Sequence, residues 1–359
     1  MKIKDITSDE ASIVQRFRPL LVLYPEIPAG KERVENEGFP EVEPLNHDYH
    51  PRDIRIVLDH SSLHRTWDIR MLLRRCSLHR RTAKKKEKRE PWQTMLDAME
   101  RDGYTRDLNI LGDAVSPSDR DEFWRRYGAI RKEDYPLRCY ARLVPGTPAR
   151  KNRIVIQYWY PYFYNDFWNT HEMDWELAMI VFKLDGEGLR PSVCACAGHH
   201  SGFWLPWREV ERANSLKERV PDGEHPIIYV ANGSHANYFY GPGSYATAPP
   251  AATMAASLLD DRIPIDYVTS FDKKNSYLVE AVVIPEPANG VWEGDWRWLN
   301  QNGLWGTPGK WLGFDLGDAG PSGPPRQRMR WENPFRWIDT VCKQASRQDM
   351  ITPPTLLEP

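Results

Sequence analysis

The feature that most constrains this chain is a change of hydrophobic period near residue 136, where apolar residues begin to alternate with polar ones. The run Ile154-Val155-Ile156-Gln157-Tyr158-Trp159-Tyr160 is rich in β-branched and aromatic residues, which favour strands. Further strands are expected over residues 175–184, 191–197, 226–231 and 277–284. Turn residues such as Asp185-Gly186 separate them. This spacing, with little helix in between, predicts an antiparallel β-sandwich.

The first 130 residues have a mixed pattern. Residues 12–25 predict a strand or short helix leading into a buried strand, and Ile54–Leu58 predicts another strand. Helical patterns follow Pro91 and begin at Ser116-Pro117-Ser118-Asp119. We therefore expect a mainly β fold with α insertions. The expected division is sandwich strands over 1–60, a basic helical section over 61–130, a β-sandwich with a cation site over 131–340, and a tail over 341–359.

Composition and charge exclude several classes of protein. The 359 residues include 15 Trp, 16 Tyr and 30 Pro, which argues against a helical bundle. Formal net charge is −2, so the chain is no polyelectrolyte. No stretch reaches the ~18 apolar residues of a membrane span, and the start of the chain lacks the apolar region of a secretory signal. With an odd number of cysteines, five, these features predict reduced thiols and a cytoplasmic protein.

The segment His171-Glu172-Met173-Asp174-Trp175-Glu176 is the strongest chemical motif. Asp174 and Glu176 are two residues apart at the start of a predicted strand, so their side chains share a face. His171 joins them only if a loop or bulge precedes the strand. Two nearby carboxylates repel each other unless a cation lies between them. Oxygen ligands favour Mg²⁺, Ca²⁺ or Mn²⁺ over Zn²⁺, although the histidine leaves Zn²⁺ open.

Aromatic residues and further histidines are expected to wall a pocket beside this motif. His235 follows a buried strand, where sandwich loops gather, and ranks first among these histidines. Glu172 and His235 are the candidates for a catalytic base, although no nucleophile motif accompanies them. The predicted pocket residues are Trp159, Tyr162, Trp168, His199, His200, Trp204 and His235.

A basic segment lies between Arg65 and Glu90, where 11 Lys or Arg stand against 3 acids. A solvated helix face or loop is one interpretation. Attraction to anionic lipid is another, worth roughly 1 kcal/mol per cation near such a surface. No nucleic-acid-binding motif accompanies the segment. The densest patch consists of Arg80, Arg81, Lys84, Lys85, Lys86, Lys88 and Arg89.

Several blocks resemble the Vps62-like (vacuolar protein sorting) family. They include QYWYPYFYND, HEMDWE, HHSGFWLPWREV and HPIIYVANGSHANYFYGPGSY, in this order, and FRPLLVLYPEIP near the start. The resemblance covers residues 17 to 335, with the weakest match over 64–130. The family name implies a role in trafficking.

The HEMDWE segment also resembles, more distantly, the metal-site motif of the necrosis-inducing (NLP) cytolysins. This resemblance implies a β-sandwich that holds a cation at an acidic mouth and engages lipid sugar head groups. It implies His171, Asp174 and Glu176 as metal ligands and adds Asp166 as an upstream acid. Glu172 and Met173 stand where those proteins have Arg and His, which bears on what docks beside the metal.

Three functions remain open. The first is a cation-dependent binding protein for a polar head group or glycan, peripheral to a membrane. The second is a metal-dependent, hydrolase-like enzyme in the aromatic-walled pocket. The third is a structural or trafficking scaffold in which HEMDWE ties loops together.

Overall fold

The structure is a computed structural model of the chain. Its description covers residues 10–30, 47–63, 90–102, 104, 106–112, 115, 119–167, 170–185, 188–198, 202–213, 224–239, 241, 268–272, 274–307, 310–311, 314–315 and 320–349.

A six-stranded sheet forms the centre of the protein. Its two longest strands, β5 (Arg153–Asn165) and β6 (His171–Asp185), pair antiparallel along nearly their whole length. The sheet order is β12 (Glu280–Val283), β4 (Arg138–Pro145), β5, β6, β7 (Gly188–Cys196) and β8 (Phe203–Pro206). The aromatic and β-branched run predicted as a strand lies in β5, where residues 154–165 are all buried.

A second, four-stranded sheet packs on one face of the first. Its order is β10 (Asn237–Tyr238), β9 (Ile227–Val230), β1 (Leu20–Val22) and β11 (Ser276–Leu278). Leu21 and Ile228 from this sheet meet Tyr158 and Ile180 from the six-stranded sheet in one buried cluster. The two sheets therefore form the sandwich that the alternating pattern predicted.

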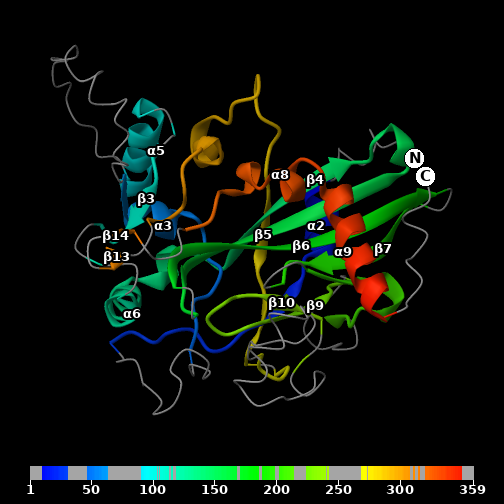
Figure 1. Ribbon diagram of the computed structural model, residues 1–359, viewed down its shortest axis with the longest axis horizontal. Coiled ribbons are helices and arrows are strands. Elements are labelled where there is room, and N and C mark those ends of the chain that lie inside the picture. The colour runs from blue at the N-terminus through cyan, green and yellow to red at the C-terminus, as the bar shows by residue number, and fades with distance from the viewer. Residues whose placement is uncertain are drawn as a thin grey trace.

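Helices cover the other face of the six-stranded sheet, and Figure 1 shows α9 lying across it. Leu96 and Phe123 from helices and Trp159 and Leu177 from strands share this second core. We call this the helical face. The helices that contribute to it are α3 (Arg55–Asp59), α5 (Pro91–Arg101), α6 (Arg120–Ala129), α8 (Arg328–Trp331), α9 (Pro334–Asp349) and the 3₁₀ turn η6 (Gly294–Asn300).

The remaining elements are short. Helix α2 (Glu10–Phe17) packs against the core between the sheets. Two small ribbons pair β2 (Ser61–Leu63) with β3 (Leu108–Ile110) and β13 (Lys310–Trp311) with β14 (Phe314–Asp315). Other 3₁₀ turns are η2 (Lys132–Asp134), η3 (Pro148–Arg150), η4 (Trp207–Glu209) and η7 (Pro324–Arg326). In the described ranges, no helix is long and apolar enough to cross a bilayer.

The structure corrects three expectations. Ile54–Leu58 was expected as a strand, but residues 55–59 form helix α3, whose first turn is held by Arg55 N donating to Asp53 Oδ1 at 2.9 Å. Helix α6 begins later than expected, because the Asp119 carboxylate caps it by accepting from Glu122 N at 3.1 Å. The sandwich is not wholly antiparallel: β1 runs parallel to β9, and β4 runs parallel to β12.

Candidate acidic site between the sheets

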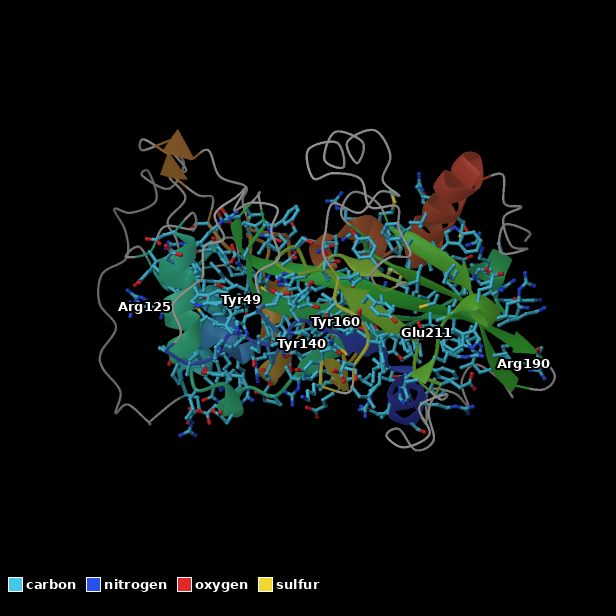
Figure 2. All side chains as sticks on the ribbon, turned by 90° about the horizontal axis from the view of Figure 1, so that it is seen from below. Tyr49, Arg125, Tyr140, Tyr160, Arg190 and Glu211 are labelled. Carbon is cyan, nitrogen blue, oxygen red and sulfur yellow. The ribbon has the colours of Figure 1, made fainter. Side chains whose placement is uncertain are left out.

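Two carboxylates of β6 face the four-stranded sheet. Asp174 pairs across the sheet with Tyr162, and Glu176 pairs with Tyr160, whose side chain Figure 2 shows deep inside the protein. Tyr160 and Tyr162 both belong to the core between the sheets. Side chains on a strand alternate, so Asp174 and Glu176 lie on this same face.

His235 lies between two carboxylates at the inner end of this group. Its Nδ1 is 3.3 Å from Asp174 Oδ2, and its Nε2 is 3.3 Å from Asp48 Oδ1. The imidazole stacks on the ring of Tyr162, with centroids 3.9 Å apart and planes 12° apart. The side chains of His235 and Asp48 are almost wholly buried. We call Asp48, Tyr162, Asp174, Glu176 and His235 the acidic pocket.

The two carboxylates keep His235 protonated. Burial by itself lowers the pKa of an imidazole, but Asp48 and Asp174 outweigh it and raise the pKa of His235 to about 9. At neutral pH the ring is therefore an imidazolium, which acts as an internal counter-ion for both acids. A protonated ring has no lone pair with which to accept a proton, so this geometry does not favour His235 as a general base.

The loop that carries His235 is shaped by its backbone. His235 itself has φ +57°, and Gly233 has φ +80° in the turn-forming dipeptide Asn232-Gly233. Gly233 approaches other backbone closely: a Cβ added to it would lie 2.3 Å from the carbonyl oxygen of Asp166. Gly233 N also donates to Asp48 Oδ2 at 3.3 Å. This loop therefore fixes Asp48 and His235 together.

The pocket becomes more accessible toward Glu176. The Asp174 side chain is 13% exposed, whereas that of His235 is fully buried. Glu176 is half-buried and accepts a hydrogen bond from Asn237 Nδ2 at 3.2 Å. Exposure therefore falls from Glu176 through Asp174 to His235.

The Tyr162 hydroxyl lies among the acids. It is fully buried and has no hydrogen-bond partner among the described residues. Burial raises the pKa of Tyr162 well above its ordinary value, and the charges of Glu176, Asp48 and Asp174 raise it further. The Tyr162 hydroxyl interacts electrostatically with three carboxylates but donates a hydrogen bond to none of them. It is therefore a hydrogen-bond donor available to a ligand.

The other predicted metal ligands have partners outside this group. His171 is the first residue of β6, and its Nδ1 donates to the backbone carbonyl of Met173 at 2.7 Å. The Asp166 carboxylate forms an ion pair with Arg120 at 3.4 Å. Within the described residues, no three His, Cys, Asp or Glu side chains are arranged to hold a metal ion. A complete site made by protein ligands alone is therefore absent there.

Glu172 points to the opposite side of the sheet. Its Oε2 accepts from Ile110 N at 3.2 Å and from Thr307 N at 2.7 Å. The cause is Met173, whose φ of +53° interrupts the alternation that would otherwise place Glu172 with Asp174. This buried carboxylate connects β3 to the segment around residue 307, an arrangement that favours a structural role over that of a base.

The predicted aromatic walls divide between the two faces. Tyr162 lies in the acidic pocket, but Trp159 and Trp204 belong to the core of the helical face. Trp159 and Tyr162 lie in different cores, on opposite faces of the sheet, because three residues along a strand reverse the side. The remaining predicted residues lie outside the described ranges: Trp168, His199, His200 and the basic patch Arg80, Arg81, Lys84, Lys85, Lys86, Lys88 and Arg89.

Sequence reasoning missed Asp48 and Asn237. Asp48 lies in an irregular N-terminal segment, and no local pattern connects it with β6. Asn237 begins β10 two residues after His235, but the left-handed φ of His235 means that strand alternation could not predict a shared side.

Comparisons with known proteins show partial likenesses. No family model matches the chain. A putative vacuolar protein sorting-associated protein of Saccharomyces cerevisiae, TDA6, is 28% identical over an alignment 165 residues long, which covers 42% of this chain and 34% of the yeast protein. The matched region thus spans about a third of that relative's length.

Among solved structures, partial matches are found with necrosis-inducing proteins. Necrosis and Ethylene inducing Protein 2 from the causal agent of cocoa's Witches Broom disease is 14% identical, with a TM-score of 0.23, over 41% of this chain and 50% of that one. NLPPya in complex with glucosamine is 17% identical, with a TM-score of 0.23, over 35% of this chain and 52% of that one. Because these TM-scores are so low, the structural matches give no information about the function of this chain.

Proposed function

We propose that this is a binding protein whose acidic pocket takes a polar head group or glycan together with a divalent cation. The observation that carries the proposal is the buried Tyr162 hydroxyl, which lies among Asp48, Asp174 and Glu176 without a described partner. In this proposal, Asp174 and Glu176 hold the cation from the accessible side. The Tyr162 hydroxyl donates to the ligand or to a water of the cation.

The charge of the pocket supports a cation. Asp48, Asp174 and Glu176 are three carboxylates, and His235 supplies a single positive charge against them. Asn237 donates to Glu176 but brings no charge. Summed over these described side chains alone, the charge is negative, and in a partly buried site it is poorly screened by salt. A divalent cation would neutralise it.

The small number of protein ligands favours a hard cation that shares its coordination with the ligand. Mg²⁺ commonly binds through one or two carboxylates and completes its shell with waters and ligand oxygens. Two carboxylates, Asp174 and Glu176, suit that mode, and Ca²⁺ or Mn²⁺ would be served by the same oxygens. Zn²⁺ would gain little from a pocket whose histidine is occupied by two acids. The cation site is thus incomplete until the ligand arrives.

The test measures cation and ligand binding together. Isothermal titration would use Mg²⁺, Ca²⁺ or Mn²⁺ alone, then inositol monophosphate or glucosamine with each metal. Flotation with phosphatidylinositol vesicles would distinguish a membrane-borne head group from a free one. The variant is Asp174→Asn with Glu176→Gln, and the control is Asp185→Asn, an exposed carboxylate at the far end of the same strand.

We expect metal and ligand to bind more tightly together than separately, and we expect the double variant but not Asp185→Asn to lose this coupling. EDTA should abolish it. Ligand binding that persists in EDTA would remove the cation from the proposal. If the double variant lowers the melting temperature but every binding activity survives, the acids belong to a structural network, as in the scaffold interpretation.

A further inference from the structure

A cavity lies on the helical face of the six-stranded sheet. Its volume is about 340 Å³, and residues of α3, α5, β4 and η6 line it. This volume falls within the range of about 300–1,000 Å³ that small-molecule sites occupy. Tyr140 of β4, which Figure 2 shows inside the protein, forms part of its wall. The acidic pocket lies on the other face of the sheet, so the two sites are separate.

Aromatic rings form a fixed wall in this cavity. Trp296 meets Tyr140 edge-on at 5.9 Å between centroids, and Trp298 lies 5.0 Å from Tyr140. Trp298 also stacks on Trp175, with ring centroids 5.7 Å apart and ring planes 9° apart. This stacking restricts the movement of the Trp298 ring. Trp296 and Trp92 are only half-buried, so part of each ring remains accessible. The cavity thus offers a rigid aromatic surface to a ligand.

Most polar groups beside this wall are paired with one another. Asp53 is buried, and both Arg138 and Arg55 form ion pairs with it, the latter at 3.1 Å. Exposed Asp295 adds a second carboxylate to the lining. The lining therefore carries two guanidinium groups and two carboxylates, and Arg138 also pairs with Glu280 beside the lining at 2.6 Å. A charged ligand would meet a like charge here, and a purely apolar chain would cover the Asp295 carboxylate without offering it a hydrogen bond.

We propose that this cavity binds a neutral saccharide. The negative π face of Trp296 suits the weakly positive C–H face of a sugar ring. The hydroxyls of the sugar can donate to Asp295 and accept from the remaining N–H groups of Arg138. A neutral sugar combines an apolar face with many hydroxyls and no charge, which is the chemistry this lining matches.

Binding is tested with mono- and disaccharides, including mannose, galactose, N-acetylglucosamine, maltose and cellobiose. Isothermal titration up to about 50 mM would detect Kd values in the millimolar range. A parallel arm uses phosphatidylcholine vesicles with or without a neutral glycosylceramide, which distinguishes a lipid-linked sugar from a free one. The variants are Trp296→Ala and Asp295→Asn. The control is Trp292→Ala, a half-buried tryptophan nearby whose indole donates to Pro285 O at 3.0 Å and which is no part of the cavity lining.

We expect one sugar class to bind saturably, and Trp296→Ala to weaken it about tenfold or more while Trp292→Ala changes it less than about twofold. Asp295→Asn should also weaken it, and because Asp295 is exposed, this variant tests the site without disturbing the core. Binding should survive Asp174→Asn with Glu176→Gln. The proposal is overturned if no sugar binds in either arm, if Trp296→Ala and Asp295→Asn both bind like wild type, or if the acidic-pocket variant abolishes binding.

Discussion

Strand β6 has opposite chemistry on its two faces within three consecutive residues. Asp174 and Glu176 face the four-stranded sheet, where acids surround a buried imidazolium. Trp175, between them, faces the helices, stacks on Trp298 and meets Trp305 edge-on at 5.6 Å. The aromatic side packs large rings against one another, whereas the acidic side places carboxylates around a buried imidazole. Under the proposed function, stability and ligand binding depend on alternate residues of one strand, so each can be changed separately.

The largest effect is expected from Trp175→Ala. This side chain is 2% exposed and contacts two other tryptophans, so its removal should cost about 3–5 kcal/mol of unfolding free energy. Urea denaturation measures the change. Trp292→Ala, at a half-buried position, provides the matched control and should cost clearly less. Equal losses would mean that the aromatic side is not the main source of stability.

The acidic side should make stability depend on pH through His235. Its pKa in the folded protein, about 9, exceeds the ordinary 6.5, so its charge stabilises the fold fully below pH 6.5. That contribution, on the order of 3 kcal/mol, should be lost as pH rises through about 9. Urea midpoints measured in EDTA between pH 6 and about 10 would show the decline. His235→Gln should flatten this part of the profile. An unchanged slope in that variant would show that other groups, such as Tyr162, set the pH dependence.

The loop that holds His235 gives an intermediate effect, through Gly233→Ala. Gly290 supplies an unusually close control, because its φ of +78° matches the +80° of Gly233 but no atom lies within 4 Å of the added Cβ. Gly290→Ala should cost about 1 kcal/mol for the left-handed backbone alone. Gly233→Ala should cost about 1 kcal/mol more, since its Cβ meets the Asp166 carbonyl. Equal melting temperatures would show that the loop can move away from Asp166.

The smallest effect on stability is expected from Trp296→Ala. The ring is half-buried at the edge of the cavity, and its loss should cost below about 1 kcal/mol. The same urea titration tests this. If Trp296→Ala lowers the unfolding free energy as much as Trp175→Ala does, Trp296 belongs to the core. The aromatic side would then show no difference between a packed interior and an edge that faces a ligand.

Strand parity explains what could be predicted from the sequence. The two-residue spacing of Asp174 and Glu176 placed both on one face without any structural knowledge. The same rule, applied to Trp159 and Tyr162, would have separated them. The alternation rule fails at Glu172 because Met173 has a left-handed backbone conformation. Since position 173 is not a glycine, the sequence gives no sign of that conformation.

Tertiary contacts explain most of what was missed. The Asp48 and His235 side chains contact each other although most of the sandwich strands lie between them in the sequence. No local sequence pattern predicts such a contact. Helix α3 is short, and Ile56, Val57 and Leu58 are all buried, so its residues show no helical period. Helix α9 was missed for a different reason. Residues 341–359 were treated as a tail, although Phe335, Ile338 and Cys342 already have helical spacing.

The position of β1 has a consequence for how the chain folds during synthesis. Leu20–Val22 lies between Ile227–Tyr229 and Ser276–Leu278, so both of its neighbours follow it by more than 200 residues. Ribosomes add about 5–20 residues per second, so β1 waits roughly 10 to 50 seconds for its second partner. During that time an apolar strand with both edges unpaired is exposed to other chains. Nascent protein should therefore depend on chaperones until residue 278 has left the ribosome.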